Sequence, residues 1–151
     1  MRSLIPAVLV FLSMTVAPVC ASGIDDKIPN QQSIDALALK ASQAPQREQC
    51  FLYAELVHQM TELSVRRYAA GDVEKATALL KQIQELTHKI HLSVADDNKR
   101  LKNAEILLNH TAYRLTGMLH ASAFEDQTLV AETLAQVNQV QTEAMMQLFR
   151  K

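Results

Sequence analysis

From Pro45 onward, the apolar residues of this chain recur every three or four positions, which is the period of an α-helix. Only 3 glycines and 4 prolines occur in 151 residues, so few positions break such a pattern. Alanine, leucine, glutamine, glutamate and lysine dominate, and these residues favour helices. The sequence therefore predicts an all-α fold, an antiparallel bundle of three to four long helices.

The first half of the predicted bundle contains a short helix and a long one. Ser33 is expected to cap a helix that runs through Ala41. The long helix begins at Pro45, which suits a first helical position, and continues to about Ala70. It is apolar on more than one side, which is typical of a central helix. Gly71 then supplies a left-handed stop before the next helix.

The segment from Asp72 to His120 allows two interpretations. An apolar stripe begins at Val73 and resumes at Leu101 without losing its phase, which favours one continuous helix of about 48 residues, roughly 70 Å long. The run of two aspartates and an asparagine favours instead a tight turn at residues 93–98. Both interpretations stay open. The resumed stripe consists of Leu101, Ala104, Leu108, Thr111, Leu115 and Met118.

The last predicted helix runs from the capping-box pattern at Ser122 to the C-terminus. Its buried stripe is Val130, Leu134, Val137, Val140, Ala144 and Leu148. Four large apolar residues fall near its ends, several of them outside this stripe, and we interpret them as a possible association face. They are Phe124, Met145, Met146 and Phe149.

Residues 1–21 have the pattern of a secretory signal peptide. Arg2 is positive, the stretch to Val19 is almost entirely apolar, and small residues follow at Cys20 and Ala21. We therefore expect an exported protein, periplasmic or extracellular, that meets a membrane only through this leader before cleavage. Residues 22–32 are expected to be a flexible lead-in, and residues 33–151 the helical domain.

The charge balance limits the classes of partner. The chain has 15 basic and 16 acidic residues, and removal of Arg2 with the leader leaves 14 against 16. Nucleic acids and anionic membranes normally require a clustered positive field, so we expect neither as a partner. Loss of Cys20 leaves Cys50 alone in the mature chain, which excludes an internal disulfide there.

Two Glu-x-x-His motifs are the most suggestive chemical pattern. They pair Glu55 with His58 and Glu85 with His88, and bundle-type di-metal proteins use such motifs on facing helices. Counted from Gly71, both motifs fall at the same level of an antiparallel hairpin. However, Glu85 and His88 lie far from the apolar stripe of their own helix and should face solvent. A metal site at these four residues is therefore an alternative interpretation only.

Two runs, Gln49 to Met60 (QCFLYAELVHQM) and Lys99 to Glu105 (KRLKNAE), resemble small exported all-helical proteins of acidobacterial-type genomes. This resemblance implies an exported bacterial protein and brings no activity, cofactor or catalytic residue with it. Our leading hypothesis is a non-enzymatic helical protein without a cofactor that binds an unknown protein partner or itself. The alternative is a bundle that binds a metal or small ligand through Glu55, His58, Glu85 and His88.

Overall fold

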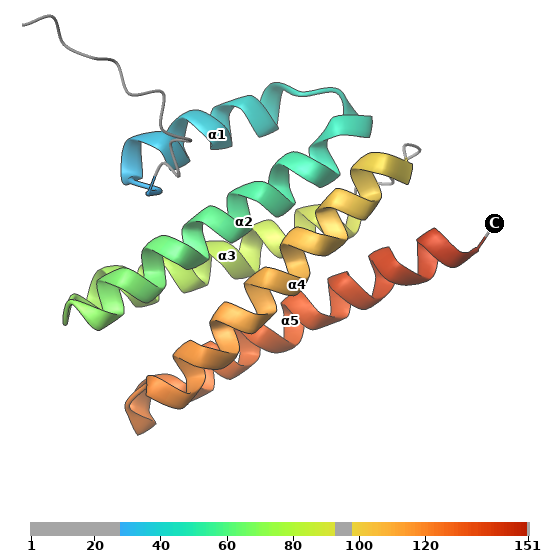
Figure 1. Cartoon of the computed structure of the whole chain (residues 1–151). Coiled ribbons are helices and arrows are strands. Elements are labelled where there is room, and N and C mark those ends of the chain that lie inside the picture. Colours follow the sequence, from blue (N-terminus) through green and yellow to red (C-terminus); the bar gives the residue numbers. More distant parts are fainter. Residues whose placement is uncertain (1–27, 93–97, 151) are drawn as a thin grey trace, which may run out of the picture.

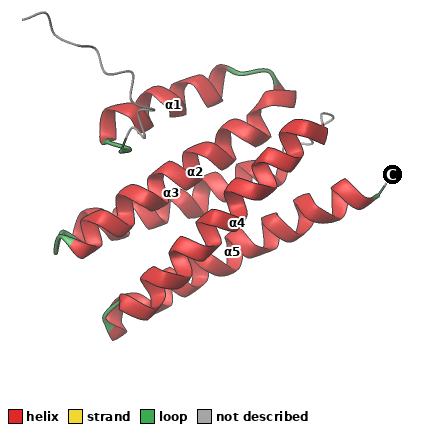
Figure 2. Ribbon diagram, in the orientation of Figure 1, coloured by secondary structure: helices red, strands yellow, loops and turns green. Residues whose placement is uncertain are grey.

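The computed structural model describes residues 28–92 and 98–150 (Figure 1). Helices account for nearly all of this part of the chain, and it contains no strand (Figure 2). The predicted all-α class is therefore confirmed. The helices are α1 (Gln31–Gln43), α2 (Gln46–Ala69), α3 (Val73–Leu92), α4 (Asn98–Ala121) and α5 (Phe124–Phe149).

The four long helices form a bundle, and α1 is added to its outside. Helix α2 packs on α3 and α4, and α5 packs on the same two helices from the opposite side. Helix α1 packs on α2. Side-chain contacts between α2 and α4 join residues 52 or 53 positions apart, as in His58 with Thr111 and Glu62 with Arg114. This constant offset means that α2 and α4 run parallel.

The structure supports the second interpretation of the segment from Asp72 to His120, because two separate helices occupy this segment. Helix α3 ends at Leu92 and α4 begins at Asn98, the last residue of the predicted turn 93–98; the other turn residues, 93–97, lie outside the described part of the chain. A single helix of about 48 residues would extend far beyond the 24 residues of α2 and leave half of its stripe exposed. Folding back allows each half to bury its stripe, so the continuous-helix alternative was wrong.

The core follows the predicted apolar stripe closely in α4, whereas in α5 the predicted Leu134 and Leu148 are only half-buried and Thr133 is buried instead. All six residues of the α4 stripe are buried, from Leu101 to Met118. Helix α2 is central, as predicted, because α1, α3 and α4 each cover part of its surface. Its buried apolar residues are Cys50, Leu52, Tyr53, Ala54, Leu56, Val57 and Met60.

The helix ends correct three details of the sequence analysis. Pro45 is the N-cap of α2, and Gln46, not Pro45, is its first helical residue. Helix α1 starts at Gln31 because Asn30, rather than Ser33, is its N-cap: the Ser33 N–H donates to Asn30 Oδ1 at 2.8 Å. At the start of α5, the Ser122 hydroxyl donates backwards to the Met118 carbonyl at 2.6 Å and caps nothing. Gly71 has the expected left-handed conformation, with φ of 82°.

The predicted leader, residues 1–21, lies outside the described residues. So does most of the predicted lead-in 22–32, but its last two residues, Gln31 and Gln32, belong to α1. Within residues 28–92 and 98–150, none of the helices combines the length and the apolarity needed to cross a membrane.

Candidate functional site

The structure does not bring the two Glu-x-x-His motifs together. Glu85 and His88 are exposed on α3, whereas Glu55 and His58 are half-buried on α2. In the described ranges, no group of three or more His, Cys, Asp or Glu side chains is arranged so that it could hold a metal ion. The two motifs lie at equal distances in sequence from Gly71, which predicted one common level along the hairpin. Their side chains nevertheless lie on differently buried faces of α2 and α3.

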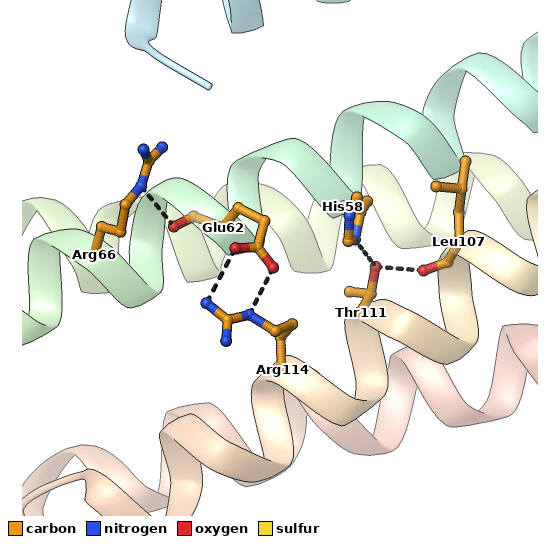
Figure 3. A network of polar contacts seen from close by, with 6 residues as sticks. All are labelled: His58, Glu62, Arg66, Leu107, Thr111 and Arg114. Carbon is orange, nitrogen blue, oxygen red and sulfur yellow. Dashed lines mark hydrogen bonds and ion pairs between the residues drawn. The ribbon is translucent and has the colours of Figure 1, made fainter. Parts of the chain in front are cut away.

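His58 instead contacts α4 (Figure 3). Its Nδ1 lies 3.2 Å from the hydroxyl oxygen of Thr111. That hydroxyl already donates its proton to the Leu107 carbonyl at 2.8 Å, so it can only accept from His58. The neutral His58 ring therefore carries its proton on Nδ1.

Several charges and partial burial act on His58 together. Burial lowers its pKa below the ordinary value of 6.5, because the imidazolium loses hydration. Glu62 acts in the opposite direction, and His110 and Arg114 add to the lowering. The His58 and His110 rings are 6.3 Å apart between centroids. His58 is therefore held in its neutral form at neutral pH.

One turn further along α2, Glu62 forms a two-bond ion pair with Arg114 of α4 (Figure 3). Arg114 Nε and one terminal nitrogen donate to the two carboxylate oxygens at 2.6 and 3.0 Å. Arg66 donates to the Glu62 carbonyl and also to the carbonyl of Pro29, which ties the start of α1 to α2. Sequence analysis missed this pair, since the pairing is visible only once α2 and α4 are known to be parallel.

Beyond this pair, the ends of α2 and α4 enclose an open hollow of about 750 Å³. Its wall is mainly apolar, and Tyr68 stands at its α2 side, with its hydroxyl bonded to the Asp126 carboxylate and the Ala123 N–H at 2.9 and 2.8 Å. None of the residues that line the hollow is acidic. They are Val65, Tyr68, Ala69, Tyr113, Arg114, Thr116, Gly117, Met118, His120 and Ala121.

The solvent side of α4 carries a second stripe, which we call the outer stripe. It has the same alternating spacing of three and four residues as the buried stripe, but all of its members are exposed. Tyr113 is 77% exposed at its centre, and Ile106 is 41% exposed at its start. The outer stripe consists of Ile106, His110, Tyr113, Gly117 and His120.

The apolar residues predicted to lie outside the core of the last helix are indeed exposed. Phe124 is at the first turn of α5, whereas Met145, Met146 and Phe149 form neighbouring positions in its last turns. Phe149 is 80% exposed. These residues lie at the two ends of α5, so they do not make one continuous surface. The outer stripe of α4 is the longer exposed periodic feature.

Comparison with known proteins found no match among family models, curated proteins or solved structures. The likeness to small exported helical proteins stays a resemblance of two short runs. The function of this chain is therefore argued from its own geometry.

Proposed function

We propose that this chain is an exported, non-enzymatic helical protein that acts by associating with another protein chain through the outer stripe of α4. The observation that carries the proposal is the aromatic side chain of Tyr113, which is 77% exposed on the solvent side of α4. The large exposed Tyr113 at its centre has the character of an interface anchor, because aromatic residues are enriched there.

The polar groups beside the stripe support binding over catalysis. His58 donates to Thr111, and both carboxylate oxygens of Glu62 accept from Arg114. These bonds join α2 to α4. They occupy Nδ1 of the His58 imidazole and the Glu62 carboxylate, which are groups that a reaction would need. A general base requires an accessible lone pair near a substrate. We call these bonds between α2 and α4 the polar seam. We therefore interpret the polar seam as a support for the α4 surface.

The proposal is tested by measuring association of the purified protein with itself and with an envelope extract. Light scattering after size-exclusion chromatography measures self-association, and cross-linking followed by pull-down measures other partners. Tyr113→Ala should abolish the association. Phe149→Ala removes an aromatic residue of similar exposure at the end of α5 and should leave it unchanged. A strict monomer without any Tyr113-dependent capture would refute the proposal.

A second candidate, a bundle that binds a small ligand, is favoured by the hollow between α2 and α4. A volume of about 750 Å³ is within the range of small-molecule sites. The metal form of this hypothesis at Glu55, His58, Glu85 and His88 is tested by elemental analysis of protein purified without chelator. Stoichiometric metal that His58→Ala and His88→Ala both remove would support it, and metal unaffected by either change would end it.

A further inference from the structure

His58 has a second ring nitrogen that the polar seam does not use. Its Nδ1–H donates to the Thr111 hydroxyl, which can only accept because it donates its own proton to the Leu107 carbonyl (Figure 3). The neutral ring therefore carries its lone pair on Nε2. Within residues 28–92 and 98–150, this nitrogen has no hydrogen-bond partner. A half-buried imidazole is thus held by one nitrogen and offers the other as an electron-pair donor.

The imidazole of His110 on α4 lies beside the ring of His58. The two ring centroids are 6.3 Å apart, and the ring planes are tilted by 55°. The two residues are 52 positions apart in sequence, so only the parallel packing of α2 and α4 brings them together. His110 is exposed, and its ring has no hydrogen-bond partner in the described part of the chain. Two imidazoles from different helices therefore meet with free nitrogen atoms.

The separation of the two rings suits a shared transition-metal ion. A Zn²⁺ ion lies about 2.0–2.1 Å from each ligating nitrogen, so two ligating rings have their centroids at most about 6.4 Å apart, and about 5 Å apart at a tetrahedral angle. The observed 6.3 Å is within the upper limit, and the exposed His110 side chain is free to rotate closer. A shared ion must also lie in both ring planes, and planes tilted by 55° meet.

The neighbouring charges are compatible with a bound cation. Glu62 lies one turn after His58 on α2, and Arg114 lies one turn after His110 on α4. These two side chains pair through two hydrogen bonds, so the carboxylate offsets the charge of the guanidinium. A cation between the two rings therefore meets no unpaired positive side chain from these two turns of the described helices.

We propose that His58 and His110 together bind one divalent transition-metal ion of the class that prefers imidazole ligands, namely Zn²⁺, Cu²⁺ or Ni²⁺. His58 donates the lone pair of Nε2, and His110 donates the lone pair of its neutral ring. Water fills the remaining coordination positions, because His110 is exposed to solvent. The bound ion links α2 to α4. This site goes beyond the proposed association through Tyr113 and does not depend on it.

Thr111 is the positioning residue of this site. Metal-ligating histidines commonly donate their other ring N–H to an acceptor, which fixes the tautomer and the orientation of the ring. The Thr111 hydroxyl provides this acceptor for Nδ1–H of His58 before any ion arrives. One of the two ligands is therefore already oriented in the folded chain.

The proposed site differs from the four-residue alternative at the two Glu-x-x-His motifs. Both hypotheses use His58, but the second histidine here is His110 on α4 rather than His88 on α3. His88 is exposed on α3, whereas the His110 ring lies beside His58. Substitution of single histidines therefore distinguishes the two hypotheses.

The first experiment measures metal binding by calorimetric titration of Zn²⁺ and Cu²⁺ into the purified, tag-free protein after removal of chelator. The native chain should bind one equivalent, and Cu²⁺ should bind more tightly than Zn²⁺. His110→Ala should raise the dissociation constant at least about tenfold, because one of two protein ligands is lost. His120→Ala and His88→Ala are matched controls that remove equally exposed histidines, and they should not change it.

The second experiment asks whether the ligands come from two packed helices. In the unfolded chain His58 and His110 are 52 residues apart, so the ion should stabilise the folded state preferentially. Zn²⁺ should raise the Tm of the native protein and of His120→Ala but not that of His110→Ala. Thr111→Val keeps both ligands and should weaken binding by about tenfold, since it removes the outer acceptor. Far-UV circular dichroism shows whether each variant still folds.

The results assign the metal to one pair of residues or to none. Loss of binding in His110→Ala, with retention in both controls, supports the proposal. Retention of binding in folded His110→Ala overturns it. Loss in His88→Ala alone assigns the ion to α3 and overturns it too, as does a native chain that binds neither ion.

Discussion

The two faces of α4 have the same spacing and opposite surroundings. The inner face buries a stripe of six residues from Leu101 to Met118 against α2 and α5, whereas the outer stripe from Ile106 to His120 is exposed throughout. The inner stripe is mainly aliphatic with one threonine. The outer stripe mixes one isoleucine and one tyrosine with two histidines and a glycine. Residues on every face of a helix have this spacing, so side-chain composition, and not the spacing, distinguishes the face that packs.

This difference separates the face of α4 that holds the bundle together from the face on which the proposed association depends. Aliphatic residues that fill space tightly hold the bundle, since their burial contributes stability in every molecule. Substitutions on the two faces should therefore differ in their effects.

The largest difference is expected between Leu108 and Tyr113. Leu108 is 0% exposed in the inner stripe, so Leu108→Ala should lower the free energy of unfolding by about 3 kcal/mol through lost burial and a cavity. Tyr113→Ala should change it by less than about 0.5 kcal/mol, because little of this side chain is buried in the monomer. Urea unfolding followed by circular dichroism at low protein concentration measures both. Equal losses would mean that the two faces do not differ as described.

Much of the bundle could be predicted from the sequence, because the apolar residues of a buried helix face recur every three or four positions. The buried residues of α4 were predicted without error, and Gly71 marked the turn between α2 and α3. The break between α3 and α4 could not be decided, since the two stripes remain in phase across residues 93–97. Only the packing of α4 against α2 and α5 distinguishes two helices from one.

The polar seam could not be predicted because it depends on helix neighbours far apart in sequence. His58 was singled out for its spacing from Glu55, yet its partner is Thr111 on a helix that runs parallel to its own. Glu62 and Arg114 carry no local signal, and they meet only through the same parallel packing. The residues of the outer stripe carry no clear apolar pattern in the sequence, whereas the inner stripe of the same helix is mainly aliphatic. Only the inner stripe was therefore predicted.

Removal of the Thr111 hydroxyl tests the polar part of the inner face. Thr111→Val keeps the shape of the side chain but leaves the Nδ1 proton of His58 without its acceptor. We expect a loss of about 1 kcal/mol in the free energy of unfolding, the usual cost of an unpaired, partly buried polar group. The double variant with His58→Leu should recover part of this loss. A double-mutant cycle with zero coupling energy would contradict the bond between the two residues.

On the outer face, Gly117→Ala should stabilise the folded chain. Alanine has the higher helix propensity and its Cβ meets no neighbour, so the free energy of unfolding of the monomer should rise by about 0.8 kcal/mol. Thermal unfolding measures the effect. A monomer that alanine destabilises would indicate a contact at Gly117 within its own chain.

The smallest expected effect concerns the protonation of His58 in the polar seam between α2 and α4. Burial lowers the pKa of folded His58 below the value of 6.5 expected in the unfolded chain, so the unfolded chain binds the proton more readily. The stability that neutral His58 contributes is therefore complete above pH 6.5 and is lost as the pH falls through the lower pKa of the folded state. His58→Asn keeps an N–H donor in reach of Thr111 but cannot titrate. The free energy of unfolding of the native protein should thus decline more steeply than that of His58→Asn as the pH falls below 6.5. Identical pH profiles for the two proteins would show that His58 titrates in the fold as it does in the unfolded chain, and the seam would then be as open to water as the outer stripe.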